Sequence, residues 1–419
     1  MVESRIQLFL QHRTVIMTTV KPTTLQTDLD YSLQLNRWLL KPIGVWPKSS
    51  TTTKTEKVIS LILNVICYSF ITITVVPCIL HLVLEDDDIR TKLILFGPLC
   101  HWVFGCIDYT TLLMYSKEIN WCVEQMKSDW HAVTRAEVQK VMLKNAKIGR
   151  YVAAFCATFM HAAIVFYNIV QTLTTEIIQV GNETRIVRML PCVAYKKLIP
   201  VDTNPTNEII FVVQLISGFI VTSGLVGALS LATAFTAHVY GQLNILMMWI
   251  SEFVNQSRHH DKCADLNGIR AIVEKHLTIF SFISHIDTII NGICFMELLR
   301  VTFSACLLGY YILVEWANQD FQNMISYALV LGSYSFHIFT LCFIGETITE
   351  QCNKVGEAVY MSNWYYLPER DILDLMLILS RSYVTTKITA GKIIHMSFYA
   401  FASVMKTAFA YLNILLQML

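Results

Sequence analysis

Charged residues are scarce in this chain of 419 residues, since Asp, Glu, Lys and Arg together make up 15% of it. Hydrophobic residues make up 54%, and the mean hydropathy is +0.49. Such a composition lies well outside that of ordinary soluble domains and places the chain in a lipid bilayer. The net charge of +1 provides no general basic field, so we expect no nucleic-acid partner.

Signatures of several other protein classes are missing. There is no P-loop, no G-x-S-x-G and no H-E-x-x-H, so we predict that the chain is not an enzyme and uses no cofactor. The related halves with broken spans that mark many transporters are also lacking. Most of the 12 cysteines fall in apolar runs and form no disulfide framework. Arg258-His259-His260 near Cys263 lacks a second ligand pair, so we interpret it as a solvated loop and predict no metal site.

Seven apolar runs are long enough to cross a hydrocarbon core of about 30 Å, which takes about 20 helical residues. We therefore predict an all-α polytopic membrane protein whose first span also serves as the insertion signal, because no cleavable signal peptide precedes it. The run Leu375–Leu379 is too short to cross, and we predict a buried cytoplasmic helix that starts near Asp371. The predicted spans are Val58–Leu84, Leu93–Tyr115, Tyr151–Leu173, Ile209–Phe235, Thr288–Val314, Met324–Ile344 and Ile393–Leu419.

Basic residues predict the orientation of these spans, because Lys and Arg are retained on the cytoplasmic side. With the amino terminus inside, 24 of the 32 Lys and Arg residues are cytoplasmic, 6 are outside, and Arg300 and Lys406 lie within spans. The sequon at Asn182 then falls outside, where glycosylation can occur, and the sequon at Asn255 falls inside. Seven spans place the carboxyl terminus outside, opposite to a G-protein-coupled receptor.

This orientation divides the chain into four parts. A cytoplasmic amino-terminal segment (1–57) precedes six spans with their loops (58–344), and a cytoplasmic segment (345–392) precedes the seventh span (393–419). The cytoplasmic segments between spans are about 35 to 50 residues long, and long loops of this kind are often functional. We expect them to pack together as a shared base.

Aromatic and polar residues gather in the outer halves of spans two, three, four and six. They predict a pocket for a small, mostly apolar ligand. The alternative is interfacial anchoring, because Trp and Tyr side chains settle near any membrane surface. The candidate ligand-binding residues are Phe96, Trp102, His161, Tyr167, Phe211, Gln214, Tyr327 and Tyr334.

The seventh span has a stripe on one helical face, formed by Thr407, Tyr411, Ile414 and Met418. Such a face can line a narrow pore that large apolar side chains close by excluding water, with Gln417 as a polar group nearby. The alternative is that the stripe packs against neighbouring spans, which periodicity alone favours because any buried helix has such a face.

Charged residues within the predicted spans include Lys406, Glu297 and Arg300. Placing the charge of Lys406 within the membrane costs several kcal/mol unless the side chain forms an ion pair, extends to the membrane surface or contacts water. Lys406 lies about 80° around the helix from Ile414. Glu297 and Arg300 are three residues apart on one helix face, so we interpret them as an ion pair with a structural role.

Several motifs resemble those of insect odorant receptors, in particular the set found in ants, bees and wasps. Leu35–Pro47 resembles the opening segment of that family, and His238–Leu243 resembles its signature below the fourth span. The resemblance covers nearly the whole chain and is most specific near the carboxyl terminus. The other matching motifs are Leu307–Tyr311, Asn363–Pro368, Thr389–Lys392, Met405–Thr407 and Tyr411–Leu415.

The resemblance implies a subunit of a tetrameric, ligand-gated, non-selective cation channel in the plasma membrane of olfactory sensory neurons. It implies olfactory co-receptor subunits, membrane lipid and a small odorant as partners. By the same resemblance, seventh spans line the pore, with gate positions at Ile414 and Met418, and odorants bind among spans two, three, four and six. An anchor between subunits would include Trp364, Tyr365, Leu367 and Pro368.

Two features depart from the family pattern. Val384–Thr386 occupies a link where the family commonly has a proline, and Thr236–Asp287 lacks the long insert of the co-receptor. We therefore predict an odorant-tuning subunit, in which Lys406 is expected by the family pattern and has a packed or hydrated structural role. Two alternatives are a gustatory-type channel subunit, which would need no co-receptor, and a seven-helix receptor that acts through a G protein.

Overall fold

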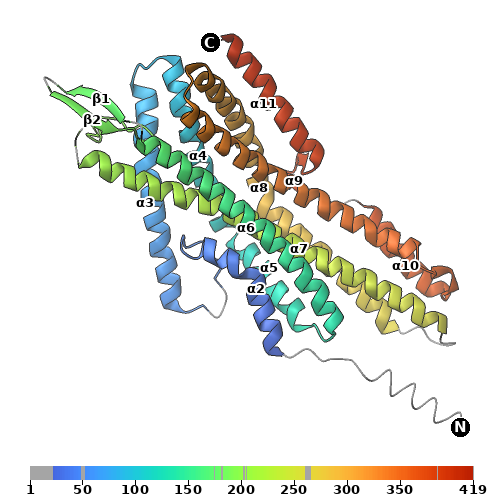
Figure 1. Ribbon diagram of the computed structural model, residues 1–419. Helices are drawn as coiled ribbons and strands as arrows, with labels where there is room; N and C mark the ends of the chain where they lie inside the picture. Colours follow the sequence, from blue (N-terminus) through green and yellow to red (C-terminus); the bar gives the residue numbers. More distant parts are fainter. Residues whose placement is uncertain are drawn as a thin grey trace, which may run out of the picture.

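The computed structural model describes residues 22–48, 52–173, 175–180, 183–201, 203, 205–259, 266–384 and 386–418. Over these residues the chain is a bundle of long helices with two small β-hairpins (Figure 1). Within the described residues, seven helices are long and apolar enough to span a membrane, which confirms the predicted number of spans. Three residues that the sequence singled out, Asn182, His260 and Cys263, lie outside the described residues.

The elements follow one another with short connections. The seven membrane-length helices are α3 (Lys54–Leu84), α4 (Ile89–Met114), α6 (Ala136–Leu173), α7 (Thr206–His259), α8 (Leu266–Asn318), α9 (Phe321–Tyr360) and α11 (Phe398–Met418). The other helices are α2 (Pro22–Leu40), α5 (Ser116–His131), the 3₁₀ turn η1 (Trp364–Tyr366) and α10 (Glu369–Tyr383). Two antiparallel hairpins pair β1 (Thr175–Val180) with β2 (Glu183–Arg188) and β3 (Thr389–Ala390) with β4 (Ile394–His395).

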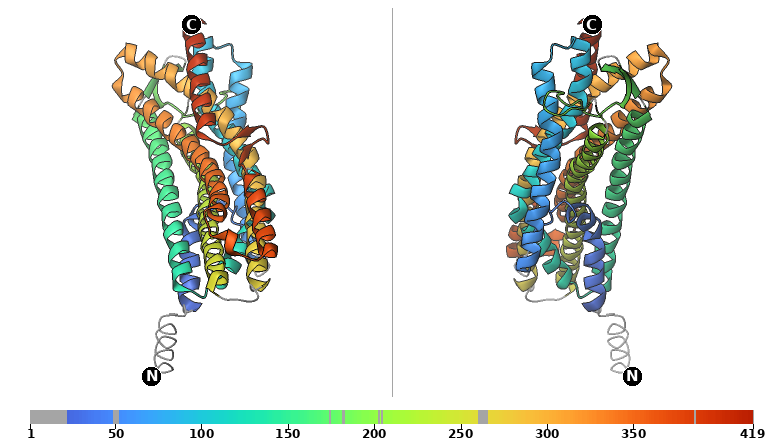
Figure 2. Two further views of the ribbon diagram at one scale, coloured as in Figure 1. Left: turned by 90° about the vertical axis from the view of Figure 1, so that its right-hand side faces the viewer. Right: turned by 90° about the vertical axis from the view of Figure 1, so that its left-hand side faces the viewer.

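Several helices extend well beyond the predicted spans. Helix α7 has 54 residues and α8 has 53, so each is about 80 Å long at 1.5 Å per residue. The predicted cytoplasmic loops are therefore largely helical, and the extra turns lie side by side at the end of the bundle that also holds α2 and α10 (Figure 2). The carboxyl end of α11 lies at the opposite end, which we call the C-terminal end of the bundle. Helix α10 begins at Glu369, close to the predicted Asp371.

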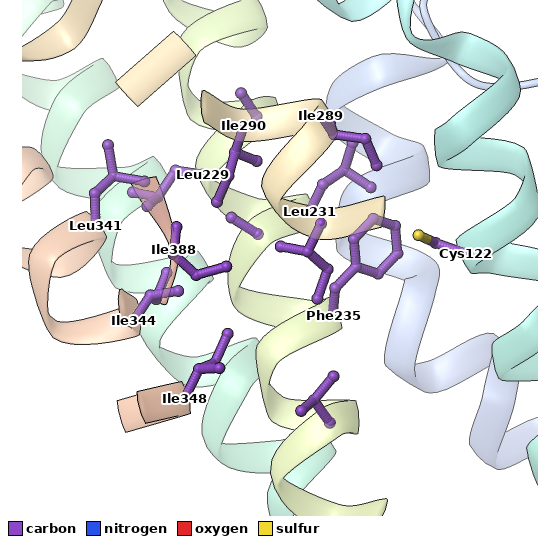
Figure 3. Close-up of a cluster of buried hydrophobic side chains, with 14 of the residues drawn as sticks. Cys122, Leu229, Leu231, Phe235, Ile289, Ile290, Leu341, Ile344, Ile348 and Ile388 are labelled. Atoms are coloured by element: carbon purple, nitrogen blue, oxygen red, sulfur yellow. The ribbon is translucent and has the colours of Figure 1, made fainter. Parts of the chain in front are cut away.

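One part of the apolar core lies where α7, α8 and α9 meet. Figure 3 shows aliphatic side chains of these three helices pointing toward one another. Because the same cluster includes α5 and the segment before β3, it also fixes the connection into α11. The side chains labelled there are Cys122, Leu229, Leu231, Phe235, Ile289, Ile290, Leu341, Ile344, Ile348 and Ile388.

The start of the last helix differs from the prediction. We predicted it at Ile393, but α11 begins at Phe398, after the hairpin of β3 and β4. Gly391 and Lys392 both have φ of 60°, and two successive left-handed residues cannot belong to a right-handed helix. The hydropathy of this segment gave no sign of the hairpin, because Ile393 and its neighbours are apolar.

Polar contacts with α8 hold this hairpin. The carboxylate of Asp287 accepts hydrogen bonds from the backbone N–H and the hydroxyl of Thr389, at 2.7 and 2.9 Å. The N–H of Gly391 donates to the carbonyl of Asn291 at 2.9 Å. The point from which α11 leaves the bundle is therefore fixed to the middle of α8.

Gly345 in α9 packs against the segment after the hairpin, where an added Cβ would lie 2.3 Å from the carbonyl oxygen of Met396. We predict that Gly345→Ala lowers the free energy of unfolding by about 1–3 kcal/mol, because the backbone must shift. Gly292→Ala is the matched control, since its Cβ would meet nothing within 4 Å and alanine favours a helix over glycine by about 1 kcal/mol. Thermal unfolding of the purified variants measures both, and equal midpoints would contradict a tight contact at Gly345.

Candidate functional site

A cavity opens among the helices near the C-terminal end of the bundle. It holds about 1020 Å³ of empty space, including the part continuous with solvent, which is room for a small organic ligand. Helices α4, α6, α7, α8 and α9 and residues 189–193 form its walls. Its aromatic and polar lining residues are His101, Trp102, Tyr167, Asn168, Ser304, Tyr311, Tyr327 and Tyr334, and its apolar ones include Ile94, Leu95, Ile164, Pro191, Val193, Leu307, Leu308 and Val330.

Four of the eight predicted ligand-binding residues line this cavity, namely Trp102, Tyr167, Tyr327 and Tyr334. The rings of Tyr167 and Tyr327 face each other with centroids 6.4 Å apart. The indole N–H of Trp102 donates to the hydroxyl of Ser217 at 3.0 Å. These four residues come from α4, α6 and α9, so three helices distant in sequence contribute aromatic walls to one space.

The other four predicted residues lie outside the cavity. Phe96 is 39% exposed, Phe211 is buried, and His161 bonds the carbonyl of Ala157 and the hydroxyl of Ser223. Gln214 is buried and holds the backbone of the segment that precedes α7. These residues lie in the predicted halves of their spans but on other helical faces, which the sequence could not distinguish.

Two parts of the cavity wall were missed. Helix α8 contributes Ser304, Leu307, Leu308 and Tyr311, although the pocket was expected among spans two, three, four and six. The segment before α7 contributes residues 189–191 and 193. In the sequence, the motif Leu307–Tyr311 was noted only for its family resemblance. Its two tyrosines match the aromatic character of the other pocket candidates and could have indicated that this part of α8 lines the cavity.

Close packing of α4 on α8 forms one wall. The hydroxyl of Tyr311 donates to the carbonyl of Leu93 at 2.5 Å. At Gly97 an added Cβ would lie 3.2 Å from that hydroxyl, so a residue without a side chain allows the two helices to approach. The ring of Tyr311 lies 5.4 Å from that of Tyr327, which continues the aromatic wall onto α9.

The polar floor of the cavity consists of His101 and Tyr334. The hydroxyl of Tyr334 lies 2.9 Å from Nδ1 of His101, and Nε2 of His101 lies 3.4 Å from the hydroxyl of Thr222. The guanidinium of Arg300 lies 4.9 Å from the centroid of the Tyr334 ring, within the range of a cation–π interaction. Both floor residues are therefore fixed by neighbours deeper in the bundle.

Beneath this floor lies the ion pair that the sequence predicted. Arg300 and Glu297 form a salt bridge, and both side chains are fully buried. Nδ1 of His337 in α9 lies 3.3 Å from the same carboxylate, and Asp108 of α4 is also buried here. Because charges in a membrane interior are costly without partners, these groups hold α4, α8 and α9 in a defined arrangement.

We predict that Glu297→Gln destabilises the protein by about 3–5 kcal/mol, because it leaves the charge of Arg300 buried without its counter-ion. Glu274→Gln is the matched control, since Glu274 pairs with Arg270 on the same helix but both side chains are exposed, and we expect no measurable change. Thermal unfolding in detergent tests both. An equally small shift for both variants would show that the buried pair does not stabilise the fold.

Helix α11 packs on α8 and α9 through one side. Phe401, Val404 and Ala400 contact the main core, while Leu412 and Leu415 join a smaller cluster with Leu307, Tyr310 and Tyr311 of α8. At Gly309 of α8 an added Cβ would lie 2.8 Å from the side chain of Leu412. The wall of the cavity and the packed side of α11 therefore share residues of α8.

The predicted pore stripe lies away from this packed side. Tyr411, Ile414 and Met418 are 48%, 52% and 79% exposed, and Thr407 is half-buried. Gln417 and Lys406 are also exposed. Within the single chain, the large apolar side chains of the stripe are therefore exposed on a membrane-length helix.

The predicted anchor residues surround the start of α10. Tyr365 and Pro368 are exposed, Trp364 is half-buried and Leu367 is buried. Helix α10 buries one face and leaves the apolar side chains of Leu373, Met376 and Leu377 exposed. An exposed apolar face outside the membrane-length helices marks an interaction surface.

Comparison with known proteins identifies the protein family of this chain. The family described as 7tm Odorant receptor matches residues 99–409. The chain belongs to this family, which confirms the resemblance seen in the sequence. Because the family consists of receptors, the prediction that the chain is not an enzyme is also confirmed.

Individual relatives agree with this assignment. Odorant receptor 10 of Aedes albopictus is 25% identical over 213 residues, or 51% of this chain and 56% of that protein, so the chain spans about half the length of this curated relative. The odorant receptor coreceptor of Ooceraea biroi is 25% identical over 154 residues, or 36% of this chain and 31% of that protein. The insect olfactory receptor OR5 of Machilis hrabei in complex with eugenol has the same fold, with a TM-score of 0.75 and 16% identity over 93% of this chain and 100% of that chain.

Proposed function

We propose that this chain is the odorant-tuning subunit of a ligand-gated, non-selective cation channel that it forms with the olfactory co-receptor. One observation carries the proposal: in an odorant receptor fold, an aromatic cavity and a terminal helix with an exposed apolar face share the same stretch of α8. Membership of the receptor family and similarity to coreceptor sequences support it.

The orientation and location belong to the same proposal. The amino terminus is cytoplasmic and the carboxyl terminus extracellular, because that arrangement keeps most Lys and Arg residues on the cytoplasmic side. The protein resides in the plasma membrane of olfactory sensory neurons, and its subtype is the one found in ants, bees and wasps. Asn182 would then be accessible to glycosylation.

The ligand is a small, mostly apolar molecule that binds in the cavity. Aromatic rings from α4, α6, α8 and α9 provide apolar contact, and the floor formed by His101 and Tyr334 provides a polar contact that fixes the ligand's orientation. Both the size and the lining of the cavity suit such a molecule.

Gating couples the cavity to α11 through α8. Ligand binding favours the arrangement of Leu307 and Tyr311 found in the open state, and these residues share a cluster with Leu412 of α11. The seventh helices of the assembled subunits then move apart at Ile414 and Met418, with Gln417 nearby. A ligand that binds the open state better by about 1.4 kcal/mol shifts the ratio of open to closed channels tenfold.

Assembly uses surfaces that the single chain leaves exposed. The apolar face of α10, together with Trp364, Tyr365, Leu367 and Pro368, forms the anchor between subunits in a tetramer with co-receptor chains. The exposed sides of α11 face the pore and the neighbouring subunits, and lipid covers the outward sides of the remaining spans.

Recording of odorant-evoked current tests this function. Cells that express the chain with the co-receptor should show a ligand-evoked cation current that persists when G-protein signalling is blocked. Current without the co-receptor would favour the gustatory-type alternative, and loss of the current on G-protein blockade would favour the metabotropic one.

The cavity assignment predicts the effect of Tyr327→Ala in the same assay. The variant removes an aromatic wall, and the loss of a buried apolar contact of about 1.5–3 kcal/mol should raise the half-maximal odorant concentration about ten- to a hundredfold. Phe96→Ala is the control, because Phe96 was also predicted to bind ligand but lies outside the cavity. If Phe96→Ala has the larger effect, the ligand binds elsewhere.

The gate assignment predicts that Ile414→Ala and Met418→Ala change ion permeation or pore block, because smaller side chains no longer exclude water from the closed pore. Leu416→Ala serves as the control, since Leu416 is exposed on another side of α11. Current–voltage relations and channel block of the co-expressed variants measure this. Unchanged permeation and block in both stripe variants would show that the gate lies elsewhere.

A further inference from the structure

Two buried cysteines from distant parts of the sequence meet beside the cavity. Cys78 lies near the end of α3 and is 1% exposed, while Cys192 lies in the segment between β2 and α7 and is 2% exposed. The structure contains both as free thiols. The Cys78 thiol raises the pKa of the Cys192 thiol, which places the two side chains close together although 113 residues separate them in the sequence.

Backbone contacts hold the two segments together independently of the sulfur atoms. The N–H of Tyr195 donates to the carbonyl of Pro77 at 3.1 Å, immediately before Cys78. The side-chain amide of Gln214 donates to the carbonyl of Cys192 at 2.6 Å and accepts from its N–H at 3.0 Å. This bidentate contact fixes the backbone at Cys192. It also gives Gln214 a positioning role in place of the ligand contact expected from the sequence.

We propose that Cys78 and Cys192 form a disulfide bond that ties residues 189–193 to α3. The S–S bond is about 2.05 Å long, and the backbone contacts at Pro77 and Cys192 hold the two segments beside each other. The inference rests on the proposed orientation of the chain, which places this segment on the oxidising, non-cytoplasmic side of the membrane, where disulfides form and persist.

The reaction is thiol–disulfide exchange with an oxidised protein dithiol of the secretory compartment. One cysteine, as its thiolate, attacks the disulfide of that oxidant to give a mixed disulfide, and the second cysteine then displaces the oxidant as a reduced dithiol. Two thiols of this chain lose two protons and two electrons, and the oxidant gains them. The neighbouring Cys78 thiol and burial raise the pKa of Cys192, so the exchange takes place before the segment packs against α3.

The bond would set the geometry of the ligand site. Pro191 and Val193, the two neighbours of Cys192, line the cavity. With Cys192 bonded to α3, this wall cannot move away from the helices independently. Reduction would leave the wall held by hydrogen bonds and packing, so odorant sensitivity becomes dependent on the redox state of the receptor.

Peptide mass spectrometry of the full chain tests the bond directly. The receptor is purified with its co-receptor from membranes, denatured and alkylated without reductant, and then digested. We expect a disulfide-linked pair of peptides that contain Cys78 and Cys192, with Cys294 alkylated as a free thiol. Recovery of Cys78 and Cys192 as alkylated thiols would overturn the proposal. This measurement does not depend on odorant-evoked current. The disulfide can therefore be absent while the proposed function is correct, and it can be present while the proposed function is wrong.

Serine variants give a second, functional comparison. Cys78→Ser, Cys192→Ser and the double variant should lower the thermal unfolding midpoint by the same amount, because each removes the same bond. A reductant should lower the midpoint of the wild type and leave that of the double variant unchanged. Cys294→Ser is the matched control, being 1% exposed on α8, and should keep the response to reductant. Additive losses in the single variants, with no response of the wild type to reductant, would contradict the bond.

Discussion

The buried ion pair between Glu297 and Arg300 is the interaction on which the arrangement of the ligand cavity depends. Neither charge has access to water, so each must keep its partner, and this requirement fixes the rotation of α8 in the bundle. Arg300 then supports the ring of Tyr334, and Tyr334 contacts His101 across the cavity floor. The positions of the polar groups in the cavity floor are thus set by the buried charges beneath them.

Helix α8 connects the two functional regions because its successive turns contact different partners. The turn at Glu297 packs against α9, and the turns from Ser304 to Tyr311 form the cavity wall. The same turns hold Leu412 of α11. The side chains of Leu307 and Tyr311 therefore separate the cavity from Leu412 of the terminal helix. Because α11 packs on α8 and α9 through one side, its position depends on these two helices.

The sequence predicted those features that depend on composition and periodicity. Hydropathy located seven spans because each must bury its length in lipid, and the three-residue spacing of Glu297 and Arg300 predicted their pairing. Hydropathy did not show that α7 and α8 continue far beyond the bilayer, because their outer turns are amphipathic. It also missed the hairpin before α11, where two left-handed residues interrupt an apolar run.

Four of the eight candidate ligand-binding residues line the cavity and four do not, for a specific reason. All eight residues lie toward the same end of the bundle as the cavity. A cavity is lined by one face of each helix, however, and Phe96 and Trp102 lie on different faces of α4. Which face of a helix points toward the cavity depends on how the helix packs against its neighbours. Contacts between helices, such as that of Tyr311 with Gly97, determine this packing. The contribution of residues 189–193 was not predictable because no periodicity marks an irregular segment.

The central claim is that α11 lines the pore of an assembled channel, and the accessibility of a substituted cysteine tests it most directly. Met418→Cys, co-expressed with the co-receptor, is exposed to a positively charged thiol reagent while odorant-evoked current is recorded. The account predicts that the reagent reduces the current irreversibly, and that it reacts faster when odorant is present. If the reagent leaves the Met418→Cys current unchanged yet blocks that of Leu416→Cys, the face of α11 assigned to the pore is the wrong one.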